Sequence, residues 1–310
     1  MKLLSQKAIS YIFTLIIVVF VIYYLVNNWE SVKSIGWWER PGYLCIHMVL
    51  LLLTFTLFVI SWQRLLITIG NYISIKVACY TWLTPNIGKY FPGKVFMIAG
   101  RIVLLNRFGV RKATAVAATI WEHVILILTA MPFSLFLLFD SSEEYSLKMV
   151  AMTVSVFILI LIVVLNPVII QKSINIALRI FKKPLLDLSL KRKDIFYLFN
   201  FYLMIWVVYG LTGVTLAYAF GFEDNVSMLL LFNVYIFSWF IGFISMITPG
   251  GFGVREGVLI LMISPYVPVA ELMIYAFLAR MTWMLTEIAG VIVGMVVCNK
   301  LNAQPNEHQN

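Results

Sequence analysis

The sequence predicts an all-α integral membrane protein with about six full membrane spans and two shorter, broken helical hairpins. Hydrophobic residues make up 62% of its 310 positions and charged residues only 12%, whereas a soluble domain is about half apolar and a quarter charged. Several apolar runs reach the ~18 residues or more that a membrane-spanning helix needs. Two segments rich in proline and glycine then interrupt apolar chain, at 84–94 and 248–257.

The charges of the loops predict how the spans are oriented. Residues 64–112 hold eight Lys or Arg and no acid, and residues 171–194 hold seven Lys or Arg against two Asp. Loop 140–148 is net acidic. Because cytoplasmic loops carry the excess of Lys and Arg, we expect the N-terminus and both basic segments in the cytoplasm, at the inner (cytoplasmic) membrane. The expected full spans cover residues 8–26, 43–61, 113–139, 149–165, 195–220 and 271–298.

We treat residues 1–298 as one polytopic transmembrane domain and residues 299–310 as a short polar tail in the cytoplasm. The formal charge of +9 is explained by these loops, so no nucleic-acid partner is expected. The cysteines have no metal-type spacing, and the chain has no Walker loop, HExxH or GxSxG motif. We therefore expect neither a metal nor a cofactor.

The first break lies between two apolar segments, 72–83 and 95–105, that are too short to cross a ~30 Å hydrocarbon core as single helices. Proline lacks an amide donor, and glycine adopts backbone angles that other residues avoid. We therefore expect a re-entrant hairpin over about 72–105 that enters from the cytoplasm. A pair of amphipathic helices on the membrane surface is the alternative. The residues expected to break the helix here are Pro85, Gly88, Pro92 and Gly93.

The second break, TPGGFGVREG, follows a run without any charge, 228–247. A broken backbone is tolerated in hydrocarbon only where protein covers it or water reaches it. The segment is therefore a loop at the membrane surface or a re-entrant turn that lines a cavity, and the adjacent Arg255 and Glu256 favour the cavity. The residues expected to break the helix here are Pro249, Gly250, Gly251 and Gly253.

The number of crossings depends on the second hairpin, about 228–264. If residues 228–247 crossed the membrane fully, the second break would face the cytoplasm. We expect them instead to enter from outside and return, because both breaks begin with Thr-Pro and continue with glycine and a basic residue. Two broken segments that enter from opposite faces are typical of an inverted-repeat transporter with its site near the midplane.

The combination of GKYFPGK, Gly100–Arg101, Glu122 and TPGGFGVREG resembles the lysylphosphatidylglycerol synthase/flippase transmembrane family, over about residues 10–298. Many members carry Glu-Arg where this chain has Glu122–His123. The resemblance implies lipid translocation or the handling of a lipid-linked substrate. The soluble synthase sequence is missing from the chain, so we do not expect it to transfer lysyl groups alone.

The buried charges predict a path for a lipid head group. Arginine's planar fork suits phosphate oxygens, and free amides at half-helix N-termini add donors. Glutamates would balance these cations. The alternatives are that Arg280 and Glu287 form a structural ion pair on one helix face, and that Arg255 and Glu256 cap a helix start. The candidate pathway residues are Lys94, Arg101, Glu122, Arg255, Glu256, Arg280 and Glu287.

Three functions remain open. The first is a flippase-like translocator of an anionic phospholipid or a polyprenyl-linked lipid. The second is a membrane-embedded transferase acting on a lipid-linked sugar, with Glu30 or Glu39 as base, although the short expected external loops leave little room for a sugar-binding domain. The third is a non-catalytic partner of a glycosyltransferase or synthase. Membrane lipids are the expected partners in each case.

Overall fold

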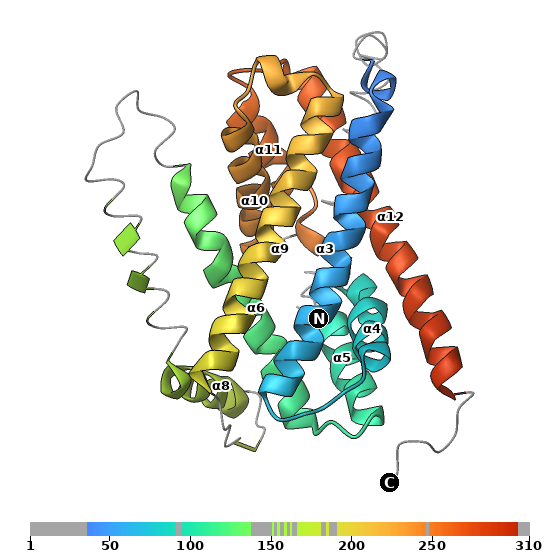
Figure 1. Cartoon of the computed structure of the whole chain (residues 1–310), viewed down its shortest axis with the longest axis vertical. Coiled ribbons are helices and arrows are strands. Elements are labelled where there is room, and N and C mark those ends of the chain that lie inside the picture. The colour runs from blue at the N-terminus through green and yellow to red at the C-terminus, as the bar shows by residue number, and fades with distance from the viewer. Residues whose placement is uncertain are drawn as a thin grey trace, which may run out of the picture.

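The chain forms a bundle of helices of two lengths (Figure 1). Over the residues that the computed structural model describes, there are nine α-helices, short 3₁₀ turns and no strand. The described residues are 36–90, 95–137, 166–180, 191–245 and 248–302, with short pieces between 151 and 162 and at 184–185.

Four helices are long and apolar enough to cross a membrane. They agree with four of the predicted spans, and each boundary differs from the prediction by a few residues. The predicted span at 8–26, most of the one at 149–165 and most of the polar tail lie outside the described residues. The four long helices are α3 (Pro41–Thr68), α6 (Lys112–Phe136), α9 (Arg192–Ala219) and α12 (Val269–Asn302).

The described elements follow the same order twice. A long helix is followed by a short helix, a 3₁₀ break, a second short helix and another long helix. The two series run in opposite directions (Figure 1). The first hairpin consists of α4 (Ile75–Leu83), η2 (Thr84–Tyr90) and α5 (Val95–Arg107). The second consists of α10 (Met228–Ile244), η5 (Pro249–Gly251) and α11 (Val254–Ile263).

Both hairpins begin with the same local signal. Ser74 precedes α4 and accepts a hydrogen bond from the Val77 amide at 3.3 Å. Ser227 precedes α10 and accepts one from the Leu230 amide at 3.2 Å. A serine in this position satisfies an amide that the first turn of a helix leaves without a partner. The two helices therefore start where the sequence provides a cap.

The long helices pack through an antiparallel pair, α3 and α9, which makes the most extensive helix contact. His47 on α3 joins three long helices, because its ring nitrogens hydrogen-bond to the Thr212 carbonyl at 2.8 Å and to the Thr282 hydroxyl at 2.9 Å. Gly213 on α9 lies against the Tyr235 ring of α10. Its carbonyl accepts a bond from Tyr275 of α12 at 2.9 Å. These contacts fix the frame that carries the hairpins.

Two features differ from the sequence prediction. Helix α11 begins at Val254, four residues earlier than predicted, because the Glu256 carboxylate accepts a hydrogen bond from the Gly253 amide at 2.6 Å and caps the helix. Arg255 and Glu256 thus lie in the first turn of α11. Residues expected in a basic loop form α8 (Pro167–Ile180), which packs on α6.

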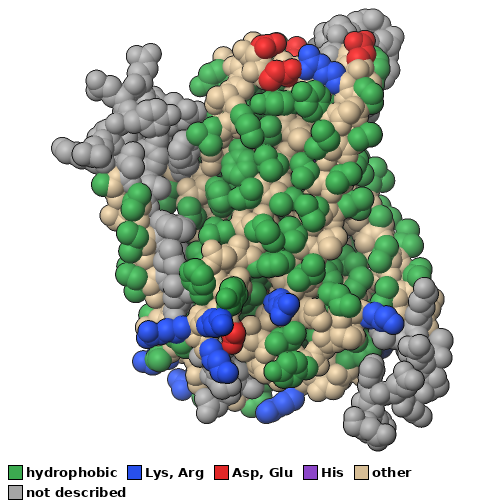
Figure 2. Space-filling view, viewed as in Figure 1, with side chains coloured by type: hydrophobic (Ala, Val, Ile, Leu, Met, Phe, Trp, Pro, Cys, Tyr) green, Lys and Arg blue, Asp and Glu red, His purple; other side chains and the backbone are tan. Residues whose placement is uncertain are grey.

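Charge is separated along the long axis of the molecule (Figure 2). One end carries basic side chains and the other acidic ones, with a mostly apolar surface between them. Arg40 and Glu223 pair at the acidic end and join α3 to the segment after α9. In Figure 1 the first hairpin lies toward the basic end and the second toward the acidic end.

Candidate functional site

The two breaks meet inside the bundle, where η2 contacts η5. Gly250 has a φ of 62°, in the left-handed region that glycine adopts without strain. Its carbonyl accepts a hydrogen bond at 3.1 Å from Arg280 of α12. The Arg280 guanidinium lies 5.6 Å from the Tyr90 ring centre of the first break. One side chain of a long helix therefore contacts both breaks.

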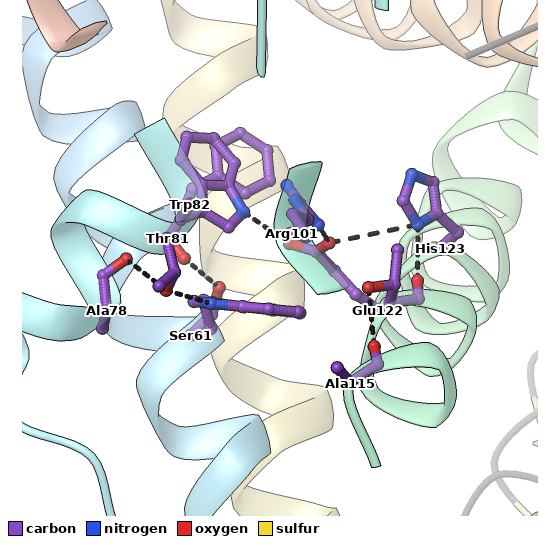
Figure 3. Close-up of polar contacts among 11 residues, drawn as sticks. Ser61, Ala78, Thr81, Trp82, Arg101, Ala115, Glu122 and His123 are labelled. Atoms are coloured by element: carbon purple, nitrogen blue, oxygen red, sulfur yellow. Dashed lines mark hydrogen bonds and ion pairs between the residues drawn. The ribbon is translucent and has the colours of Figure 1, made fainter. Parts of the chain in front are cut away.

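The first ion pair joins the first hairpin to α6. Arg101 on α5 pairs with Glu122 on α6, and both side chains are 2% exposed. Trp82 of α4 donates its indole N–H to the other Glu122 oxygen at 2.6 Å (Figure 3). The Arg101 guanidinium also lies 4.8 Å from the Trp62 ring centre. The aromatic faces and the carboxylate make this buried charge tolerable.

The second ion pair joins the first break to α12. Lys89 pairs with Glu287. The Tyr90 hydroxyl donates to the other Glu287 oxygen at 2.5 Å, and the Trp283 indole donates to the same oxygen as Lys89 at 2.7 Å. Both Glu287 oxygens are thus occupied by donors of the protein.

The third ion pair joins the second hairpin to α12. Arg280 Nε lies 3.8 Å from Glu256 Oε1, while Glu256 Oε2 accepts the Gly253 amide that caps α11. Arg280 also lies over the Phe252 ring at 5.4 Å. Each of the three glutamates therefore connects a hairpin with a long helix or fixes the start of a hairpin helix.

Arg255 differs from the other cations of the cluster. Within the described part of the chain it has no ion-pair or hydrogen-bond partner, whereas Lys89, Arg101 and Arg280 each pair with a carboxylate. Its guanidinium lies 5.3 Å from the Trp239 ring centre on α10. Gly242 makes room for it, because a Cβ at that position would overlap the Arg255 side chain. Lys89, Arg101, Arg255 and Arg280 face three carboxylates, so the described cluster has a formal charge of +1 when His123, which lies 3.9 Å from Glu122, is counted as neutral.

Two cavities meet at this cluster and share Arg255 and Trp283 as lining residues. The larger holds about 600 Å³ of empty space, its mouth included, and reaches Arg101, Glu122 and Lys89. The smaller holds about 340 Å³ and reaches Glu256 and Arg280. We call the two cavities together the chamber. The volume open to water is about 70 Å³ in the larger cavity and about 30 Å³ in the smaller. The chamber therefore leaves no room for acyl chains, and a head group would enter only with movement of its walls.

The structure brings together six of the seven predicted pathway residues, Arg101, Glu122, Arg255, Glu256, Arg280 and Glu287, around the chamber. Lys94 lies outside the described residues, as do Pro92 and Gly93. Pro85 and Gly88 lie in η2, while Pro249, Gly250 and Gly251 form η5, with Gly253 at the α11 cap.

The suggested pairing of Arg280 with Glu287 is wrong, although both residues lie on α12. Arg280 instead pairs with Glu256, and Glu287 pairs with Lys89. The alternative of Glu256 as a helix cap is confirmed. The tertiary structure explains the difference. The first break places Lys89 beside Glu287, and the second hairpin places Glu256 beside Arg280.

Sequence reasoning missed Lys89, Tyr90 and the tryptophans that donate to glutamates, Trp82 and Trp283. A lysine next to a break glycine in GKY was a usable signal, because a charge inside an apolar hairpin needs a buried partner. No signal in the sequence pointed to the tryptophans. The described residues include no group of three or more His, Cys, Asp or Glu arranged to hold a metal ion.

Comparison with known proteins agrees with the membrane architecture. The profile of the family described as "Lysylphosphatidylglycerol synthase TM region" matches residues 9–290. A search among curated proteins found no match. The matched range includes both hairpins, all six cluster residues named above and most of α12. The chain therefore belongs to the lysylphosphatidylglycerol synthase TM region family, as a helical membrane protein.

Proposed function

We propose that the protein moves an anionic lipid head group across the membrane through the chamber between its two breaks. The observation that carries this proposal is Arg255, a guanidinium at the junction of both cavities without an anionic partner among the described residues. An unpaired charge inside a membrane protein is costly, and such residues mark substrate paths by default. A lipid phosphate would supply the missing partner.

The charge distribution supports an orientation for this path. The end of the molecule rich in Lys and Arg (Figure 2) would face the cytoplasm. The first hairpin would then enter from the cytoplasmic side and the second from outside, which leaves the two breaks near mid-depth. Both termini of the chain would lie in the cytoplasm, and the membrane would be the inner, cytoplasmic one.

The composition of the chamber walls supports different locations for the head group and the acyl chains of the lipid. The head group would occupy the polar chamber while the acyl chains stay in the surrounding hydrocarbon. Arg255 would contact the phosphate, and the three ion pairs would hold the hairpins against the long helices. A chamber that excludes bulk water strengthens each of these electrostatic contacts.

Translocation in reconstituted vesicles tests the proposal. The wild-type protein is expected to equilibrate a chain-labelled phosphatidylglycerol between leaflets, and Arg255→Met should slow this. A hydrogen bond to a charged group contributes about 1.5–3 kcal/mol, so we expect a decrease of roughly tenfold to a hundredfold. Leaflet distribution is measured by quenching of the outer label with a membrane-impermeant reductant.

Arg107→Met is the matched control, because it removes the same charge from the exposed end of α5. It should translocate lipid at the wild-type rate. If Arg255→Met matched the wild type as well, the chamber would not be the path. The role of a non-catalytic partner for a synthase or glycosyltransferase would then be favoured.

A further inference from the structure

Among the described residues, the chamber has a charged partner for an anion but none for a cation. Each glutamate of the cluster is already engaged. Glu287 receives Lys89 and Trp283 on one oxygen and Tyr90 on the other. Glu122 receives Trp82 on one oxygen and Arg101 on the other. Among the described residues, these two carboxylates have no oxygen without a donor.

Glu256 is engaged in a different way. One oxygen caps α11 through the Gly253 amide at 2.6 Å, and the other lies 3.8 Å from Arg280. An ammonium group that took this carboxylate would have to compete with Arg280, which is itself buried and has no other ion-pair partner among the described residues. Removing one member of a buried pair leaves an uncompensated charge. Recognition of an amine here is therefore unfavourable.

Apart from His123, which lies 3.9 Å from the Glu122 carboxylate, the other described polar groups in the chamber wall carry no charge at neutral pH. Asn86 of the first break lines the larger cavity, and Ser238 of α10 lines the smaller one. Amides and hydroxyls form hydrogen bonds with the hydroxyl groups of a glycerol or a sugar. They cannot replace a carboxylate as the partner of an ammonium group that has lost its water.

We infer that the head group is a phosphodiester with one negative charge, hydroxyl groups and no amine. This inference rests on the proposed function and narrows its substrate. One negative charge balances the formal +1 of the described cluster. A second negative charge, as in a phosphomonoester or a diphosphate, would exceed that balance beside three carboxylates. An aminoacylated or ethanolamine head group would bring an ammonium without a partner.

The first test measures binding, separately from transport. The full-length protein in detergent is incubated with chain-matched phosphatidylglycerol, phosphatidylethanolamine, lysyl-phosphatidylglycerol and phosphatidic acid, and bound lipid is measured by native mass spectrometry. Phosphatidylglycerol is expected to bind at least about tenfold more tightly than the other three, because each of them leaves at least one charge unpaired. Arg255→Met should remove this preference, and Arg107→Met should keep it. Equal or tighter binding of lysyl-phosphatidylglycerol would overturn the inference.

The phosphodiester could belong to a glycerophospholipid or to a polyprenyl monophosphate sugar. A polyprenyl phosphate glucose is therefore compared with phosphatidylglycerol, and a polyprenyl diphosphate with both. The tighter of the two phosphodiesters identifies the natural source. Tightest binding of the diphosphate would contradict the charge balance and overturn the inference.

A reversal of preference gives a second test. Asn86→Asp is nearly isosteric and places an unengaged carboxylate in the larger cavity. The variant should lose phosphatidylglycerol affinity by about tenfold and gain affinity for phosphatidylethanolamine by a similar factor. An unchanged preference in the folded variant would contradict the inference.

Transport measurements separate the two proposals. Selective phosphatidylglycerol binding without movement between leaflets would refute the proposed function and keep the inference as a description of a binding site. Movement of lysyl-phosphatidylglycerol as fast as phosphatidylglycerol, and abolished by Arg255→Met, would keep translocation and refute the inference.

Discussion

The two hairpins have the same build but treat their charges differently. In the first, both cations that reach the chamber, Lys89 and Arg101, pair with glutamates of long helices. In the second, Glu256 is paired and caps a helix, while Arg255 lies beside the Trp239 face without an ion-pair or hydrogen-bond partner among the described residues. Among the described residues, the chamber-facing cations of the first hairpin are therefore paired with carboxylates, whereas the arginine of the second hairpin is not.

This difference separates structural charges from a charge available to a ligand. Taking an ion out of water costs several kcal/mol, which a well-placed partner offsets. A cation that keeps its partner holds the fold, whereas a cation without one lowers stability until an anion arrives. Four variants, two that replace an arginine and two that add a side chain at a glycine, test whether this comparison of the two hairpins is right.

The largest loss of stability is expected for Arg101→Met. This change leaves the Glu122 carboxylate buried and without its cation, and breaking a buried pair in this way costs about 3–5 kcal/mol. The free energy of unfolding in detergent micelles, followed by SDS titration, measures it. Adding Glu122→Gln should recover part of the loss. A loss below about 1 kcal/mol would mean that the first hairpin is not held by this pair.

A smaller loss in the free energy of unfolding is expected for Gly88→Ala in the first break. An added Cβ would lie 2.6 Å from the Met97 amide nitrogen and 2.8 Å from the Phe96 carbonyl carbon. Because these are backbone atoms, η2 would have to move away from α5, and such overpacking costs about 1–3 kcal/mol. The same unfolding measurement applies.

Gly257→Ala in the second hairpin is the matched control. Nothing lies within 4 Å of a Cβ at that position, and alanine is favoured over glycine inside a helix by about 1 kcal/mol. The variant should be as stable as the wild type or more stable. A loss comparable to that of Gly88→Ala would show that the two hairpins do not differ in how closely they pack here.

The smallest effect on stability is expected for Arg255→Met, although its effect on transport should be large. The substitution leaves no carboxylate without its partner among the described residues, and it removes a partly buried charge that has no ion-pair partner there. We expect the free energy of unfolding to stay within about 1 kcal/mol of the wild type or to rise. A loss as large as that of Arg101→Met would mean that Arg255 is a structural charge, and the comparison of the hairpins would fail.

Much of the site could be predicted because the signals are local. Pro85 and Pro249 end helices wherever they fold, and Glu256 caps its own helix within a few residues. Arginines and glutamates in apolar segments had to be buried together. The pairs themselves could not be predicted, because Lys89 and Glu287 are 198 residues apart in the sequence. From the sequence alone, the other charged residues in the apolar segments were equally plausible partners.

The sequence by itself determined a membrane-embedded helical chain with two interrupted hairpins, because helix length, apolar composition and the backbone limits of proline and glycine act within one segment. The tertiary structure decided that the interruptions meet at Tyr90, Gly250 and Arg280. It also decided which glutamate neutralises which cation, and so which arginine keeps its charge available. The physical reason is that a buried charge is stabilised by whatever lies a few ångströms away, and that distance depends on packing between helices far apart along the chain.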